Sequence, residues 1–195
     1  MARMTRRGFL TQAAAALAVP YFVPSSVLGA NPPSERVIVG CIGTGGRGRH
    51  NMRGLMAYGG KVVAVCDVRK SRRDAIKRLV DAHYRNRDCK TYRDLREFLA
   101  ERTDVDVVLI ATGDRWHALA SILAMKAGKD VYCEKPGTLT IAEGRALVET
   151  AKRYCRIFQT GTQRLSQAAF VFATELARSG RLGRIHTVRA HLWPR

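Results

Sequence analysis

The sequence predicts an α/β fold in which helices cover both faces of a doubly wound parallel sheet. From residue 36 onward, short runs rich in β-branched residues alternate with longer amphipathic segments. The runs at 37–39, 61–65 and 105–110 are almost wholly apolar, as expected for strands that are buried on both faces. Repeated strand–helix–strand units form right-handed crossovers between parallel strands.

The same patterns place the individual elements. The expected strands are residues 37–42, 61–66, 105–111, 130–133 and 156–159. The expected helices are residues 46–58, 70–84, 92–100, 116–127, 141–154 and 166–178. Near the end of the chain, residues 184–193 alternate as one further strand. A lone strand has nothing to pair with, so it either joins the sheet edge or begins a second α+β domain that is missing.

The 195 residues suffice for one ordinary domain but not for two. We expect residues 36–165 to form that domain, after a short linker at 31–35 that contains Pro32 and Pro33. Residues 166–195 would then be a connecting helix and the start of a truncated second domain.

Residues 1–30 have the composition of an export signal and not of a folded segment. Arg6 and Arg7 precede an apolar run at 13–23, and no acidic residue occurs before Glu35. The run is shorter than the ~20 apolar residues of a membrane-spanning helix. The pair of arginines resembles the twin-arginine signal, which implies a translocase as partner and a periplasmic destination. An uncleaved signal would instead leave the protein membrane-associated.

The net charge of +18 is spread along the chain. Removal of residues 1–30 would remove three arginines and leave +15. The basic residues are distributed through most of the expected helices and do not form one stripe with interleaved aromatic residues, so we do not expect a nucleic-acid partner. The five cysteines include no C-x-x-C pair, which argues against both a zinc site and a disulfide scaffold.

A glycine motif directly follows the first expected strand. Gly43, Gly45 and Gly48 form G-x-G-x-x-G at the start of a helix, the pattern of a Rossmann-type dinucleotide-binding turn. The N-terminus of that helix supplies free N–H groups and partial positive charge to a pyrophosphate. Asp67 ends the second strand nineteen residues after Gly48, where an acid grips the ribose hydroxyls.

The sequence leaves the choice between NAD and NADP open. Asp67 disfavours a ribose 2′-phosphate, which indicates NAD. Four basic residues follow at once and could pair with such a phosphate, or simply form a solvated helix face. They are Arg69, Lys70, Arg72 and Arg73.

Three further segments give the chain a resemblance to the Gfo/Idh/MocA oxidoreductases, which include glucose–fructose oxidoreductase and inositol dehydrogenase. They are Ala111–His117, Ala127–Pro136 with its Glu-Lys-Pro motif, and Gln159–Arg164. The resemblance spans about residues 36–193. It implies that Lys135, as the catalytic residue, contacts the hydroxyl being oxidised, and that Pro136 follows a cis peptide bond. The cofactor-binding residues that the motif and the resemblance imply are Gly43, Thr44, Gly45, Gly46, Arg47, Gly48, Asp67, Thr112, Asp114, Trp116, His117, Glu134, Lys135 and Gln163.

For three of these residues a structural role remains an alternative. Lys135 could form an ion pair with Glu134 or lie on the surface, His117 could simply start a helix, and Gln163 could be a turn residue. Gly137 departs from the family, which usually has an apolar residue after the proline. No metal ligand is expected.

The resemblance implies NAD(P)-dependent oxidation of a sugar or polyol hydroxyl. It also implies that the sugar pocket belongs to a second domain, of which we expect this chain to contain only the start. We therefore expect dinucleotide binding without robust turnover by this chain, and a homo-oligomer only if that second domain exists. Two alternatives remain: an NAD-dependent glycosidase that works by transient oxidation and elimination, which the Glu-Lys-Pro motif disfavours, and a non-catalytic dinucleotide-binding remnant.

Overall fold

The computed structural model describes residues 36–191. The expected signal at 1–30 and linker at 31–35 lie outside the described residues, as do residues 192–195. The described part contains a six-stranded sheet in the order β3-β2-β1-β4-β5-β6. Every neighbouring pair is parallel, which confirms the doubly wound sheet.

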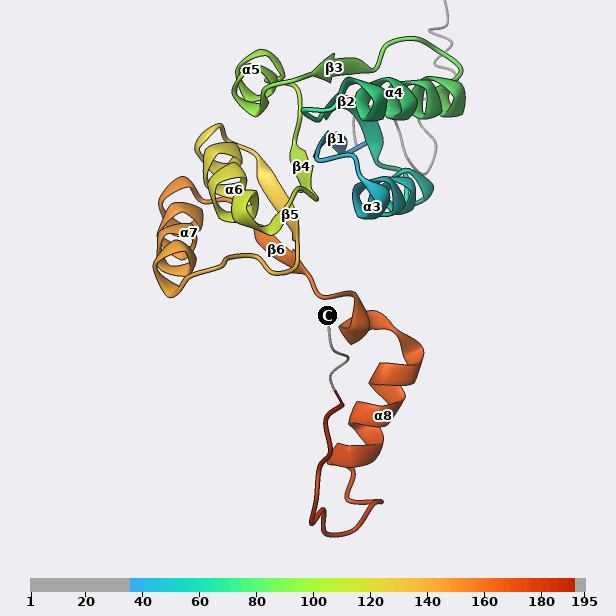
Figure 1. Ribbon diagram of the computed structural model, residues 1–195, viewed down its shortest axis with the longest axis vertical. Helices are drawn as coiled ribbons and strands as arrows, with labels where there is room; N and C mark the ends of the chain where they lie inside the picture. Colours follow the sequence, from blue (N-terminus) through green and yellow to red (C-terminus); the bar gives the residue numbers. More distant parts are fainter. Residues whose placement is uncertain (1–35, 192–195) are drawn as a thin grey trace, which may run out of the picture. The chain divides into compact units, whose positions relative to one another are not determined.

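Strands and helices alternate along the chain (Figure 1). The strands are β1 Ile38–Ile42, β2 Lys61–Cys66, β3 Lys90–Tyr92, β4 Val107–Ile110, β5 Asp130–Glu134 and β6 Phe158–Gly161. The α-helices are α3 Gly46–Ala57, α4 Lys70–Tyr84, α5 Leu95–Glu101, α6 His117–Lys126, α7 Ile141–Tyr154 and α8 Ala168–Arg178. Two short 3-10 helices, η2 Asp114–Trp116 and η3 Gln163–Ser166, follow β4 and β6.

Helices α3 to α7 divide between the two faces of the sheet (Figure 1). On one face, Met52 of α3 and Ile76 of α4 pack against Val39 and Cys41 of β1. On the other face, side chains of α5, α6 and α7 pack against the strands, among them the fully buried Phe98. Because successive residues of a strand point to opposite faces, the continuous apolar runs supply both cores at once.

Local signals in the sequence fix several helix ends. The Thr140 hydroxyl accepts a hydrogen bond from the Glu143 amide, and the Glu143 carboxylate accepts one from the Thr140 amide, a complete capping box at the start of α7. Asp94 caps α5 by accepting from the Arg96 amide. Gly128 follows the last turn of α6 and has a φ of +79°. Glycine adopts this left-handed conformation at little energetic cost and so ends the helix.

Two sequence-based predictions need correction. Residues 90–92 form strand β3, and the helix expected from residue 92 begins at Leu95. The strand expected at 184–193 is wrong for residues 184–191, which contain no strand. They find no parallel or antiparallel neighbour in the described chain, and a strand without a partner leaves its backbone groups unpaired. The remaining boundaries are unchanged or shift by one or two residues.

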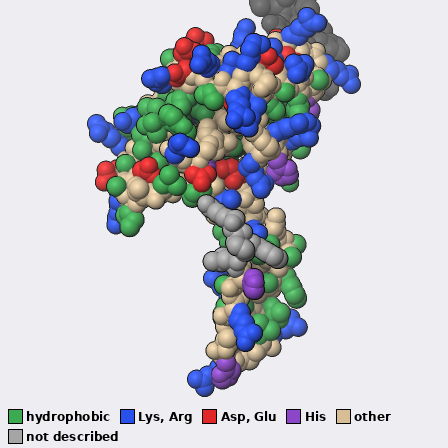
Figure 2. Space-filling view, viewed as in Figure 1, with side chains coloured by type: hydrophobic (Ala, Val, Ile, Leu, Met, Phe, Trp, Pro, Cys, Tyr) green, Lys and Arg blue, Asp and Glu red, His purple; other side chains and the backbone are tan. Residues whose placement is uncertain are grey.

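Basic side chains lie over all parts of the face drawn in Figure 2 and do not gather in one stripe. Several acidic side chains are paired locally, for example Asp74 with Lys70 and Asp94 with Arg96. These pairs are exposed and contribute little to stability. No helix within residues 36–191 is both long enough and apolar enough to cross a membrane.

Candidate functional site

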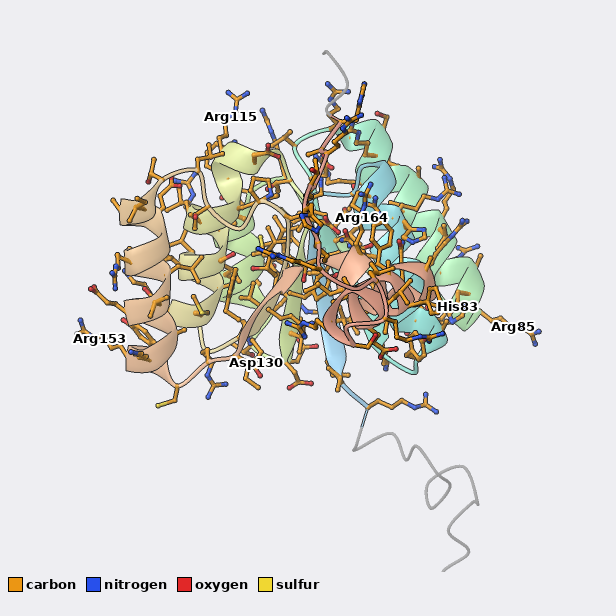
Figure 3. The ribbon with its side chains drawn as sticks, turned by 90° about the horizontal axis from the view of Figure 1, so that it is seen from below. His83, Arg85, Arg115, Asp130, Arg153 and Arg164 are labelled. Carbon is orange, nitrogen blue, oxygen red and sulfur yellow. The ribbon has the colours of Figure 1, made fainter. Side chains whose placement is uncertain are left out.

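The expected site residues meet at the carboxyl ends of the parallel strands. The chain order reverses between β1 and β4, which are neighbours in the sheet. In open α/β sheets the crevice at this switch point is where ligands bind. Figure 3 shows the polarity of the sheet: Arg115, just after β4, and Asp130, the first residue of β5, lie at opposite ends.

Two glycines of the loop after β1 are required by the fold itself. Gly43 has a φ of +84°, and a Cβ there would lie 2.6 Å from the backbone of Ala111, at the end of β4. A Cβ on Gly48 would overlap the carbonyl oxygen of Gly43. Both positions therefore exclude any side chain, because the neighbouring atoms belong to the backbone.

The other two glycines of the loop are not required by packing. A Cβ on Gly45 would meet only the guanidinium of Arg72, at an ordinary 3.5 Å, and one on Gly46 would meet nothing within 4 Å. The backbone at Gly45 is extended, with φ −66° and ψ −172°, a conformation open to every residue. The space above Gly45 is thus a cradle that a side chain would fill. It lies at the N-terminus of α3, as a pyrophosphate requires.

Asp67 lies directly beside this loop. Its Oδ2 accepts hydrogen bonds from the amide (2.8 Å) and the hydroxyl (3.0 Å) of Thr44, and its Oδ1 accepts one from the Arg69 amide (2.9 Å). Burial raises the pKa of this carboxyl, but these hydrogen bonds and the positive charge of Arg72 outweigh burial and lower it. The carboxylate is ionised at neutral pH and held at the edge of the cradle.

The basic residues after Asp67 have separate partners. Arg73 donates to the backbone carbonyl of Asp67 (2.5 Å), and Lys70 pairs with Asp74 (2.6 Å). Among residues 36–191, the Arg72 guanidinium forms no hydrogen bond or ion pair and lies beside Gly45. It is the basic side chain that the fold leaves nearest to the cradle.

The loop after β4 brings together residues of two kinds. Asp114 and Trp116 are exposed, Trp116 with 49% of its surface, and Thr112 is half-buried. His117 is 1% exposed. Its Nδ1 lies 2.6 Å from the Pro136 carbonyl oxygen and its Nε2 lies 3.2 Å from the Thr112 carbonyl oxygen. Both ring nitrogens are therefore engaged inside the protein.

Glu134 ends β5 as a buried carboxylate, 4% exposed. Its Oε1 accepts from the side-chain amides of Asn51 on α3 (2.6 Å) and Gln163 on η3 (2.5 Å). The Arg47 Nε lies 4.0 Å from the same oxygen. Gln163 is thus more than a turn residue, and Glu134 links the glycine-loop helix to the segment after β6.

Lys135 follows Glu134 on the surface of the crevice. Its side chain is exposed, and within the described residues its ammonium forms no ion pair with Glu134. The Lys135–Pro136 peptide bond is cis, as the resemblance implies. The ammonium is thus available to an external hydroxyl.

Asn51 is a site residue that was not expected from the sequence. A signal was present, since Asn51 lies four residues after Arg47 and therefore on the same face of α3. Arg72 could not be singled out from its basic neighbours, because only the fold shows which of them lies over the loop.

Comparison with known proteins finds the same kind of domain. Residues 37–162 match the model of the oxidoreductase family with an NAD-binding Rossmann fold, GFO_IDH_MocA. The chain is 34% identical over 145 residues to an inositol 2-dehydrogenase/D-chiro-inositol 3-dehydrogenase of Shouchella clausii, covering 68% of this chain and 40% of that protein. It is 38% identical over 136 residues to a glycosyl hydrolase family 109 protein of Shewanella sp. (strain MR-4), covering 67% and 29%.

Among solved structures, the myo-inositol 2-dehydrogenase of Lactobacillus plantarum superposes with a TM-score of 0.67 at 25% identity. The match covers 77% of this chain and 43% of that one. The chain therefore spans less than half the length of these relatives, and what it matches is the strand-and-helix domain that holds the glycine loop. The family match extends from β1 to the end of β6, over most of the described residues, and the chain belongs to the Gfo/Idh/MocA oxidoreductases with an NAD-binding Rossmann fold.

Proposed function

We propose that this chain is the dinucleotide-binding part of an NAD(P)-dependent oxidoreductase that acts on a hydroxyl of a sugar or polyol. The observation that carries the proposal is the cradle at Gly45, beside the ionised Asp67: packing does not require a glycine there, and only the Arg72 guanidinium comes within 4 Å of the place of a Cβ. The inositol dehydrogenases among the relatives support a cyclic polyol as the first substrate to test.

Different residues along the crevice bind different parts of the dinucleotide and the substrate. The amides at the N-terminus of α3 bind the pyrophosphate, and Asp67 accepts hydrogen bonds from the adenosine ribose. Thr112, Asp114 and Trp116 line the path towards the nicotinamide. A bound nicotinamide ring supplies the hydride acceptor. The exposed Lys135 ammonium orients the hydroxyl and takes part in relay of its proton.

We propose NAD as the preferred form of the cofactor. The carboxylate of Asp67 is ionised at neutral pH because its pKa is lowered, and it would repel a 2′-phosphate at the ribose. Arg72 favours NADP, since its guanidinium forms no hydrogen bond within the described residues and could reach such a phosphate.

The test is calorimetric titration of the chain with NAD and NADP. Gly45→Ala should leave the folded structure intact but lower the affinity for the dinucleotide by about tenfold or more, because the added methyl occupies the place of the pyrophosphate. Gly54→Ala is the matched control on the same helix, where a Cβ has nothing within 4 Å. Equal affinities of the two variants, or no binding of either dinucleotide to the unaltered chain, would contradict the proposal.

A second candidate function is glycoside cleavage by transient oxidation. The 38% identity with a glycosyl hydrolase family 109 protein supports it, whereas the Glu134-Lys135-Pro136 sequence favours a dehydrogenase. The two differ in the net redox change. A dehydrogenase accumulates NADH in proportion to the oxidised substrate, and the glycosidase releases a sugar without net reduction of NAD. Absorbance at the nicotinamide band during turnover would separate them.

We further propose export through the twin-arginine pathway to the periplasm. The support is the sequence of residues 1–30, with Arg6 and Arg7 before an apolar run. Residues 1–35 fused to a folded reporter should carry it to the periplasm of a bacterium that has this translocase. The double substitution Arg6→Lys, Arg7→Lys should abolish export, and Arg3→Lys serves as control. Export that survives the double substitution would refute the assignment.

A further inference from the structure

His117 occupies an unusual position for a residue of the crevice. It begins α6 directly after the loop that carries Asp114 and Trp116, yet its side chain is 1% exposed. Each of its two ring nitrogens lies at a backbone carbonyl oxygen, Nδ1 at Pro136 (2.6 Å) and Nε2 at Thr112 (3.2 Å). No polar atom of the ring remains for a ligand.

The two carbonyls belong to loops at the ends of different strands. Thr112 follows β4, and its amide nitrogen lies 2.6 Å from the position of a Cβ on Gly43, so this loop packs against the glycine turn. Pro136 follows β5 and is joined by a cis peptide bond to Lys135. Carbonyl oxygens only accept hydrogen bonds, so the ring donates to one of them from its N–H, the tautomer deciding which, and holds the other by close contact. The imidazole is the one side chain that bridges these two carbonyls among the hydrogen bonds of the described residues.

We propose that His117 is a positioning residue that clamps the loop after β4 to the loop after β5 and thereby sets the place of Lys135 relative to the glycine turn. The relevance to catalysis rests on the proposed function, because only there does the position of Lys135 matter. The clamp itself is a property of the protein without ligand. A lysine on an exposed loop keeps a fixed distance from the cradle only if the loop is tied to a rigid element, and α6 with its buried Ala120 and Ala124 is such an element.

The experiment measures amide hydrogen exchange of the whole chain in the absence of dinucleotide. In His117→Leu, exchange in the segments 112–116 and 135–138 should rise by about tenfold or more, while β1 and β2 stay protected, because local opening reports local contacts. Ser121→Ala is the control on the same helix: it removes a buried hydroxyl that donates to the His117 carbonyl but leaves the ring contacts in place, and both loops should keep their protection.

Two conservative variants separate the ends of the clamp. The amide nitrogen of Asn lies near the place of Nδ1 and that of Gln near the place of Nε2 in histidine. His117→Asn should therefore restore protection of 135–138, and His117→Gln that of 112–116. Faster exchange throughout the sheet in all three variants, or unchanged loops in His117→Leu, would overturn the clamp. Failure of NAD to bind, with loops that loosen as expected, would overturn the proposed function and leave the clamp standing.

Discussion

Two carboxylates end two strands of the same sheet and are held in opposite ways. Asp67, just after β2, is 8% exposed and receives its hydrogen bonds from backbone and hydroxyl groups of adjoining loops, those of Thr44 and Arg69. Glu134, at the end of β5, is 4% exposed and receives side-chain amides from remote helices, those of Asn51 and Gln163. Both are buried acceptors, but the first bonds only the loops beside it, whereas the second bonds side chains from two distant elements as well as the Lys135 amide.

The difference shows which half of the crevice is built by local chain geometry. The adenosine side follows from one glycine turn and the acid of the next strand, so a short motif specifies it. The side of β5 depends on three elements that meet only in the folded chain. We expect substitutions on the first side to act through backbone fit and ligand choice, and those on the second side to act through tertiary stability.

The largest effect is expected for Gly48→Ala, on the adenosine side. Its Cβ would overlap the carbonyl oxygen of Gly43, a backbone atom that cannot turn away as a side chain can. We expect the free energy of unfolding to fall by more than about 3 kcal/mol, at the upper end of overpacking costs. Urea unfolding followed by circular dichroism measures it. Gly46→Ala, with no neighbour within 4 Å, should unfold as the unaltered chain does.

The next effect is expected for Glu134→Gln, on the opposite side. Asn51 and Gln163 both donate to Oε1, and the Lys135 amide donates to Oε2 at 3.3 Å. A glutamine can keep its carbonyl at the first place only by turning its NH₂ towards the Lys135 amide, which is also a donor. A buried mismatch of this kind costs about 1–3 kcal/mol. Glu149→Gln, an exposed acid on α7, controls for the loss of charge. Equal free energies of unfolding of the two variants would mean that the hydrogen bonds of Glu134 contribute no more to stability than a surface carboxylate does.

A smaller effect, confined to ligand choice, is expected for Asp67→Asn. Removal of the negative charge leaves Arg72 beside the ribose site, so the ratio of NADP to NAD affinity should rise by about tenfold, or 1.4 kcal/mol. Calorimetry with both dinucleotides measures the ratio. Asp74→Asn is the control, since its carboxylate is paired with Lys70 on the outer side of α4. A ratio that does not change would remove Asp67 from the ribose site.

The smallest effect concerns pH. The folded-state pKa of Asp67 is lowered, with burial opposed by the Arg69 and Thr44 hydrogen bonds and by Arg72. Its contribution to stability is therefore fully present above the unfolded-state pKa of about 3.9 and is lost as the pH falls through the lowered value. The free energy of unfolding, measured as the pH is lowered, should fall less steeply for Asp67→Asn than for the unaltered chain. An identical fall in both proteins would show that these hydrogen bonds do not stabilise the charged form.

The sequence predicted the sheet and the glycine loop because periodicity and spacing are local properties. It missed β3, whose three residues, Lys90–Tyr92, are too short to show a period. It assigned a strand at 184–193 by alternation alone, which says nothing about a pairing partner. The ring contacts of His117 and the link from Asn51 to Glu134 join residues 19 and 83 positions apart, and no local pattern carries such contacts.

The freedom at Gly45 has a consequence for anyone who engineers this domain. A library sorted only for soluble expression or heat resistance would keep glycine at 43 and 48 but would let position 45 drift to alanine or serine, since nothing in the protein opposes a methyl there. Stabilised descendants could in this way fold better than their parent while losing their ligand. A counter-selection on immobilised nucleotide would be needed in every round.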